Sequence, residues 1–415
     1  MATKQVRLSE QTSVAADQVN VSHEVAAPSA AAPAATAAAV AANQSLADRL
    51  AASADTRHGA IRATRNSRNV RVYKTDEWFS LIFAVRNRGL TYLWQPMLLV
   101  TICAVGFTPV ATLYLSEEAC TSLQDASSAL PFVLTALSFQ LVFRLNRAAV
   151  RHYEARQLCG WMMIHTRDVA LAANATLSRD HPQARDRLCE IAVAFPVAFM
   201  LHLWGDHPSR EAAFTRMVDG IFEDPSTLAL VKAAKHRPLC LIECAQRVLF
   251  DALGPNSAAT SNGPLEQCVL TRLLDSVQGL GVPLGGCERI QGTPLPFVYV
   301  AHLRSFLITV LCAVPFVYGC EWKWATIPLS LLVAFGLLGI EAASIECERP
   351  FSPSPTKNHH DLERFAVLLS TEVMHMLQRS ESHYNGGAGT VTTQAPQAHA
   401  AGVPLARAAT LYGLR

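Results

Sequence analysis

The sequence predicts an all-α, multi-pass membrane protein with four transmembrane helices and a helical cytosolic domain. Half of its 415 residues are hydrophobic and only 16% are charged, whereas soluble domains carry about 25% charged residues. Several long stretches carry no charge at all. The first, residues 91–115, is longer than the ~20 residues that cross a bilayer. Between these stretches, apolar and charged residues mix at helical spacing, which is typical of soluble helices.

Charges beside the apolar stretches set the expected orientation. Arg86 and Arg88 precede the first span, whereas Glu117 and Glu118 follow it. Cytosolic loops of membrane proteins carry an excess of Lys and Arg, so the N-terminal end is expected on the inner side. The second span ends in further basic residues, which agrees with a return to that side. Four spans with both termini inside are therefore predicted, at residues 92–115, 131–150, 297–318 and 322–342.

Two regions predict cytosolic helices, because their apolar residues recur at helical spacing among charged ones. They are residues 153–284 and 359–379. Within the first region, residues 188–203 come closest to an additional span. Glu190 and His202 lie near the ends of this stretch, and a cytosolic helix is favoured over a span there.

Both ends of the chain have low-complexity composition. Residues 1–72 are predicted to be a disordered, Ala-rich extension, because they have little apolar surface to bury. Their basic end favours an organelle transit peptide, whereas scattered acidic residues favour a cytosolic tail, and both interpretations stay open. An interfacial amphipathic helix is expected at residues 76–89. Residues 73–380 form the expected folded domain, and residues 381–415 a disordered tail.

No motif of an enzyme or a metal centre stands out. The sequence lacks a P-loop, a G-x-S-x-G turn, an H-E-x-x-H pair and a Gly-rich dinucleotide turn, so we predict no enzyme, no cofactor and no bound metal. The histidines are scattered, and the adjacent His359 and His360 would lie on different faces of a helix. The net charge of +2 offers no argument for nucleic acid binding.

The eleven cysteines form no C-x-x-C pair and show no zinc spacing. Several, such as Cys103 and Cys312, fall in apolar stretches where cysteine behaves as a small hydrophobic residue. Reduced core cysteines are therefore favoured over a disulfide framework.

The second span carries the pattern that bears on function. Thr135, Phe139 and Phe143 recur every four residues and share one face of the expected helix. That face is uncharged, and the positive edges of aromatic rings favour an anion without binding it tightly. We interpret the face as the neck of an anion pore. Ordinary packing between helices is the alternative.

A basic collar follows the neck on the same helix. It consists of Arg144, Arg147 and Arg151, whose charge would raise the concentration of anions at the inner mouth of a pore. Arginines at this depth can also be structural. For Arg144 an ion pair is favoured, because a charge at the membrane edge normally needs a partner. The candidate partners are Glu154, Glu288 and Glu341.

Three ordered segments resemble the bestrophin family of anion channels. FRLNRAAVRHYEARQLCG at residues 143–160 is similar to the FR-x-N-x-x-x-x-R-x-[WY]-E-x-R-x-x-[WC]-G run of bacterial and plant members. GGCERIQGTPLPFVYVAHLRSFL at residues 285–307 resembles the family's GCERI-x-x-TP-[IL]-PF-x-Y signature. GIEAASIECERPFSPSPTKNHHDLERF at residues 339–365 resembles a third family segment, and the likeness covers about residues 76–380. The signature residues are Gly286, Cys287, Glu288, Arg289, Pro294, Pro296 and Phe297.

The resemblance implies a chloride channel in a lipid membrane, built from five identical subunits, with nitrate and bicarbonate as further candidate anions. It implies a hydrophobic neck at the three positions named above. Thr135 stands where the family usually has Ile or Val, which makes the outer ring more polar. A second, cytosolic constriction is implied, and we place it near residues 239–244. Animal members bind calcium with an acidic run that ECERPFSPSPTKNHHDLERF lacks, so no calcium site is predicted.

Two other functions stay open. A membrane scaffold or partner-binding protein of the same fold would not conduct, and its neck residues would turn away from the symmetry axis. A transporter is disfavoured, because the sequence shows no inverted repeat and no charged residue in the middle of a span. The membrane is undecided between a chloroplast thylakoid and the plasma membrane.

Overall fold

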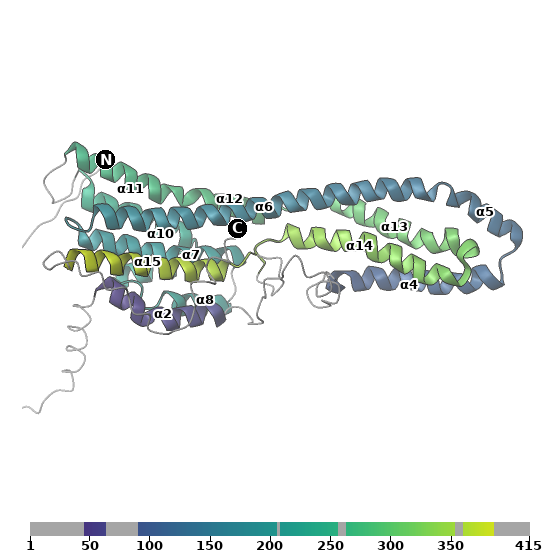
Figure 1. Cartoon of the computed structure of the whole chain (residues 1–415), viewed down its shortest axis with the longest axis horizontal. Helices are drawn as coiled ribbons and strands as arrows, with labels where there is room; N and C mark the ends of the chain where they lie inside the picture. Colours follow the sequence, from purple (N-terminus) through teal and green to yellow (C-terminus); the bar gives the residue numbers. More distant parts are fainter. Residues whose placement is uncertain (1–44, 64–89, 206–207, 256–262, 353–359, 386–415) are drawn as a thin grey trace, which may run out of the picture. The chain divides into compact units, whose positions relative to one another are not determined.

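The chain is helical throughout the residues that the computed structural model describes, and no strand occurs among them (Figure 1). The helices build two hydrophobic cores, one in a membrane bundle and one in a cytosolic bundle. The all-α fold class is confirmed. The predicted interfacial helix at residues 76–89 and most of the predicted terminal tails lie outside the described residues. The described residues are 45–63, 90–205, 208–255, 263–352 and 360–385.

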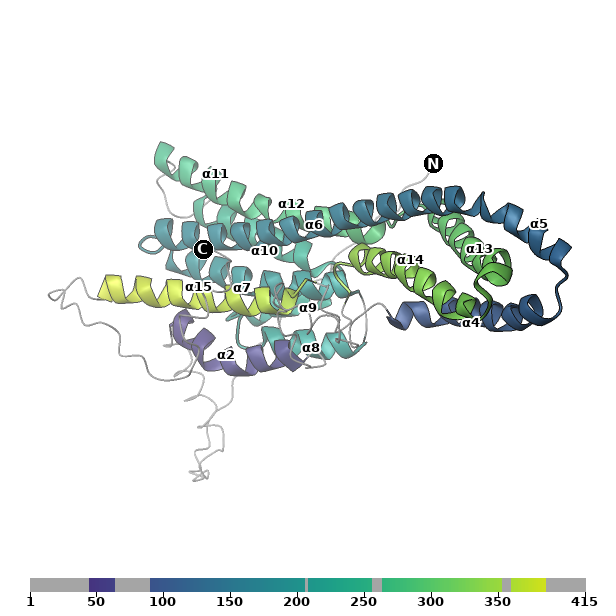
Figure 2. The ribbon, with the colours of Figure 1, turned by 45° about the vertical axis from the view of Figure 1, so that its right-hand side comes forward.

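One helix runs through both bundles. α6 (Leu130–Thr176) has 47 residues and is roughly 70 Å long at 1.5 Å per residue. Leu137 and Leu141 in its first half are buried in the membrane core, while Ala155 belongs to the cytosolic core. The change to charged residues at Arg144 therefore marks the level where the helix leaves the apolar layer, and the helix continues beyond it (Figure 2).

Four stretches of the described chain are long and apolar enough to cross a membrane. The last of them contains two helices, α13 (Phe297–Trp322) and α14 (Thr326–Glu348), joined by the 3-10 turn η1 (Lys323–Ala325). The third is buried inside the protein. The membrane bundle therefore consists of α4, the first half of α6, α13 and α14, as the sequence predicted. The four stretches are Tyr92–Leu113, Glu117–Thr176, Pro182–Trp204 and Phe297–Glu348.

The membrane bundle has an apolar inside and an apolar outside. α4 (Leu90–Leu113) packs against α13 and α14, and α14 packs against α6. Leu307 and Leu338 lie in the core between the helices, whereas Leu98 and Ile102 are more than half exposed on the outer surface. Continuous apolar surface of this kind suits contact with lipid.

A disulfide closes the outer end of the membrane bundle. The short helix α5 (Glu117–Ser127) connects α4 to α6 there, and the side chain of Ser116 caps its first turn. Cys120 on α5 is bonded to Cys320 near the end of α13. The prediction of reduced cysteines is wrong for this pair, because the partners are 200 residues apart and no spacing pattern marks them. The other cysteines in the described ranges are free.

The centre of the cytosolic bundle is α7 (Pro182–Trp204). This helix is apolar enough to cross a membrane, but 83% of its most apolar stretch of 18 residues is buried inside the protein. Every residue from 191 to 201 is buried, so α7 is apolar on all sides because protein surrounds it. The structure thus agrees with the expectation of a cytosolic helix rather than an additional span.

Helices from distant parts of the sequence surround α7. The second half of α6, α10 (Arg237–Leu253), α15 (Leu362–Asn385) and α8 (Pro208–Val218) all contact it. α9 (Pro225–Ala233) lies against α10. α11 (Pro264–Gly279) and α12 (Gly281–Gly292) pack along α6, and α12 leads directly into the membrane helix α13.

Part of the N-terminal region is ordered in the structure. Disorder was expected for residues 1–72, but α2 (Leu46–Ala63) is a helix that packs on α8 and α15. Arg57 is buried, and its guanidinium donates to the Ser370 hydroxyl at 3.2 Å and to the Leu50 carbonyl at 3.0 Å. Ser370 is 313 residues away in the sequence, so the low-complexity composition could not reveal this contact.

Candidate functional site

The three predicted neck residues lie on one exposed face of α6. Thr135 is exposed, and the side chains of Phe139 and Phe143 are 61% and 64% exposed. The opposite face carries Leu137 and Leu141, which are fully buried against α13 and α14. The Thr135 hydroxyl donates to the Pro131 carbonyl at 2.7 Å, so it is bonded to its own helix. The neck face therefore points away from the core of its own subunit.

Arg144 is fully buried at the base of the membrane bundle. Its guanidinium lies 2.6 Å from Glu341 and 3.1 Å from Glu348, both on α14. Glu341 also accepts a hydrogen bond from Arg304 on α13 at 2.7 Å. The predicted ion pair between Arg144 and Glu341 is present, and the network joins three membrane helices. A charge at this depth requires such partners, because its desolvation is otherwise uncompensated.

The three residues of the predicted collar have different environments. Arg144 is buried and paired, whereas Arg147 is exposed. Arg151 is half-buried and donates to the backbone carbonyl of Thr293 at 2.7 Å, which holds the end of α12 against α6. Of these three, Arg147 is the one that presents its charge to solvent.

The family signature lies on α12, where this helix meets α6. Gly286 faces Leu158, and a Cβ at position 286 would stand only 2.6 Å from the Leu158 Cδ2 atom. Cys287 is fully buried, and Arg289 forms an ion pair with Glu154 on α6. Small, buried and paired side chains thus allow the two helices to approach closely just below the membrane.

The remaining signature residues form the connection into the membrane. Pro294 and Pro296 are exposed and stand between α12 and α13, where proline cannot continue a helix. Phe297 is the first residue of α13, and its side chain is 83% exposed. The signature therefore encodes a helix, a rigid turn and the start of a span.

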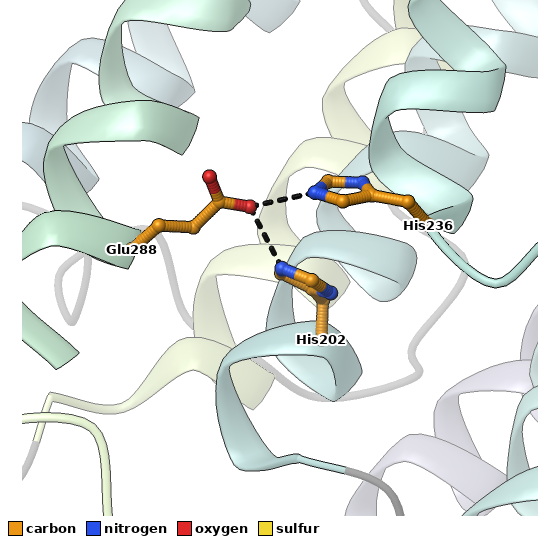
Figure 3. Close-up of side chains that lie close together, drawn as sticks. All are labelled: His202, His236 and Glu288. Atoms are coloured by element: carbon orange, nitrogen blue, oxygen red, sulfur yellow. Dashed lines mark hydrogen bonds and ion pairs between the residues drawn. The ribbon is translucent and has the colours of Figure 1, made fainter. Parts of the chain in front are cut away.

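Sequence reasoning missed a group of polar side chains at this junction (Figure 3). The Nε2 atoms of His202 and His236 lie 2.7 Å and 2.8 Å from the same carboxylate oxygen of Glu288. His202 is near the end of α7, His236 precedes α10, and Glu288 is on α12. The two imidazole rings lie 4.3 Å apart. Because 86 and 52 residues separate the histidines from Glu288, no local motif announced the group.

The region proposed for a cytosolic constriction is the start of α10. Leu239 is 54% exposed, whereas Leu241 and Cys244 are buried. Among residues 239–244, Leu239 is therefore the large apolar side chain that is exposed and could line a passage.

The fold defines a class of protein: an integral membrane protein in which one long membrane helix continues into a cytosolic helical bundle. The family follows from sequence comparison. Residues 69–373 match the family described as Bacterial/Fungal Bestrophin protein, and the chain belongs to this family. The resemblance seen in the three sequence segments is confirmed.

Two relatives are named as channels. A voltage-dependent anion channel-forming protein of Nostoc sp. is 29% identical over 286 residues, which cover 67% of this chain and 85% of the relative. The chloroplastic voltage-dependent chloride channel 1 of Arabidopsis thaliana is 28% identical over 230 residues, which cover 54% of this chain and 52% of the relative.

Solved structures show the same fold. Crystal structures of two variants of a bacterial bestrophin homologue from Klebsiella pneumoniae align with TM-scores of 0.55 and 0.58. Both are 19% identical to this chain, and each alignment covers 70% of this chain and 98% of the other. At this identity the likeness concerns the fold.

Proposed function

We propose that this chain is the subunit of an anion channel that conducts chloride passively, with nitrate and bicarbonate as further candidate anions. The observation that carries the proposal is the exposed, uncharged face of α6 at Thr135, Phe139 and Phe143. Two relatives are named as anion or chloride channels, and this chain belongs to the Bacterial/Fungal Bestrophin family.

The chemistry of this face suits an anion. Ring edges of Phe139 and Phe143 present the positive end of the aromatic quadrupole, which attracts an anion without a strong site that would trap it. A narrow apolar ring can also close the pore by losing its water. Arg147 supplies exposed positive charge below the neck, whereas the charge of Arg144 is balanced by Glu341 and Glu348.

A single copy of α6 cannot enclose a passage. The neck face is turned outward from its own subunit, so symmetry-related copies must supply the other walls. Five copies are the number implied by the family resemblance. We place the assembly in a membrane whose outer compartment is oxidising, because the Cys120–Cys320 disulfide closes that end of the bundle. A thylakoid and a plasma membrane both stay candidates.

The test is the reversal potential of purified protein in planar bilayers under a potassium chloride gradient. We expect reversal near the chloride equilibrium potential, and an altered current for Phe143→Ala. The matched control is Leu98→Ala, which removes an exposed apolar side chain on the outer face of α4. Reversal near the potassium potential would overturn the anion assignment. Folded protein without current at any voltage would favour the non-conducting scaffold.

A further inference from the structure

The group of His202, His236 and Glu288 has the composition and spacing of a metal site. Each residue offers one ligand atom, and these atoms all lie within 4.8 Å of one another. His202 comes from α7, Glu288 from α12, and His236 stands just before α10, and their side chains converge, as Figure 3 shows. In the described part of the chain, no other group of three such side chains meets this condition.

We propose that this group binds one divalent transition-metal ion of the zinc class per subunit. The ligands would be the Nε2 atoms of His202 and His236 and a carboxylate oxygen of Glu288. Two imidazoles and one carboxylate form a common three-ligand set for zinc, with the fourth position open to water. Calcium and magnesium are disfavoured, because they select oxygen ligands over imidazole.

Only a small adjustment would admit the ion. Zinc lies about 2.0–2.2 Å from nitrogen and oxygen ligands, so in a tetrahedral site neighbouring ligand atoms are roughly 3.4 Å apart. The two nitrogens now lie 2.7 Å and 2.8 Å from the Glu288 oxygen, which are hydrogen-bond distances. The three side chains are 27–36% exposed, which leaves Glu288 room to rotate and leaves the site open to solvent.

The metal-free arrangement has a defined proton pattern at His236. Its Nδ1 accepts the Leu239 backbone N–H at 3.3 Å, so Nε2 carries the ring proton and donates it to Glu288. Metal binding at Nε2 would move that proton to Nδ1 and end the bond to Leu239. The hydrogen bond that is lost is long, and the Leu239 N–H in the first turn of α10 can donate to water instead.

The position of the site suggests what an ion would do. Glu288 stands between Cys287, which is buried beneath α6, and Arg289, which pairs with Glu154 on α6. A metal would join α7 and α10 to α12 at that contact. It would therefore stiffen the link between the cytosolic bundle and the pore helix. This regulatory consequence rests on the proposed channel function, whereas metal binding does not.

The test uses the full-length protein, purified and stripped with a chelator, and titrated with Zn²⁺ against a chromophoric competitor. We expect one ion per subunit. His202→Ala, His236→Ala and Glu288→Gln should each weaken binding by more than about tenfold, since even outer hydrogen-bond partners of metal ligands change affinity by about 10–100-fold. His375→Ala on α15 is the control, because this histidine is exposed and distant in the sequence. Substitution with Co²⁺ should produce the visible absorption of a tetrahedral site.

Two outcomes would overturn the metal site: equal zinc affinity in the wild type and the histidine variants, or equal binding of Mg²⁺. In either case the group is a hydrogen-bonded junction alone. Thermal unfolding in the presence of the chelator checks that each variant is folded. If His202→Ala does not fold, His202→Gln, which keeps a hydrogen-bonding group, replaces it. Zinc should raise the unfolding temperature of the wild type and not of the variants. Zinc binding without anion current would retain the metal site and reject the channel.

Discussion

At the scale of single residues, Arg144 shows what a buried charge demands of its surroundings. Its guanidinium is fully buried, and two carboxylates of α14 neutralise it. Breaking a buried ion pair by removing one partner costs about 3–5 kcal/mol, because the other charge stays buried. Glu341 keeps Arg304 as a second partner, so the lower end of that range applies here.

Arg144→Ala should therefore lower the free energy of unfolding by about 3 kcal/mol. Thermal unfolding in detergent measures this loss. Arg147→Ala is the matched control on the same helix, and it should change stability by less than about 0.5 kcal/mol because Arg147 is exposed. Equal losses in the two variants would contradict the importance of the Arg144 ion pairs.

Glu190 adds a pH-dependent contribution in the cytosolic core. Burial raises the pKa of Glu190 to about 7, although Arg49 and the backbone N–H of Glu223 lower it. Between the ordinary value of 4.5 and about 7, the folded protein keeps the proton that the unfolded chain has released. The folded state binds more protons in this window, so stability falls as the pH rises through it.

Glu190→Gln should flatten this part of the stability profile. In the wild type, this group lowers the free energy of unfolding by at most about 1.4 kcal/mol per pH unit. In the amide variant, this pH-dependent loss of stability should be absent. Unfolding temperatures at pH 5 and pH 7.5 provide the measurement. Glu243→Gln, at an exposed position on α10, should leave the slope unchanged. A slope in Glu190→Gln equal to that of the wild type would show that another group is responsible.

At the scale of elements, the disulfide joins α5 to α13 across the outer end of the membrane bundle. We expect Cys120→Ser to lower the free energy of unfolding by about 2–4 kcal/mol, because the unfolded chain loses a constraint. A reducing agent should destabilise the wild type and have no effect on Cys120→Ser. Cys268→Ser, at an exposed free cysteine, is the control. Thiol titration of unreduced protein that finds Cys120 and Cys320 reactive would contradict the bond.

The contact between α12 and α6 offers a comparison of adjacent glycines. A methyl group added at Gly285 would enter open space, whereas one added at Gly286 would meet Leu158 at 2.6 Å. Gly285→Ala should stabilise the helix by up to about 1 kcal/mol. Gly286→Ala should destabilise the protein by about 1–3 kcal/mol, because the added atom forces the helices or Leu158 to move. Unfolding curves of the two variants that coincide would reject close packing at this point.

At the scale of the whole molecule, the proposed function requires several copies of the chain. The exposed neck face on α6 must meet its equivalents around an axis. Light scattering should find a particle of about five chains of 45.0 kDa, the number that the family resemblance implies. Phe143→Cys should form crosslinks between subunits on oxidation, whereas Leu98→Cys on the outer face of α4 should not. A monomeric particle would remove the basis for a shared pore.

The accuracy of sequence reasoning varied with the range of the contacts involved. Spans at residues 92–115 and 297–318 correspond closely to α4 and α13, because the length of an apolar stretch is a local property. The polar residues near the ends of α7 separated it from the spans in the sequence, and protein surrounds this helix in the structure. The predicted second span ends at residue 150, whereas α6 continues to Thr176, because the change of composition at Arg144 does not end the helix.

The sequence by itself determined the all-α class, the number of spans, the family and the uncharged face of the second span. These properties follow from composition, periodicity and ordered motifs, all of which are local along the chain. Only the tertiary structure decided the Cys120–Cys320 bond, the burial of Arg57 in α2 and the convergence of His202 and His236 on Glu288. Each of these depends on helices that are distant in sequence and become neighbours only when the two cores pack.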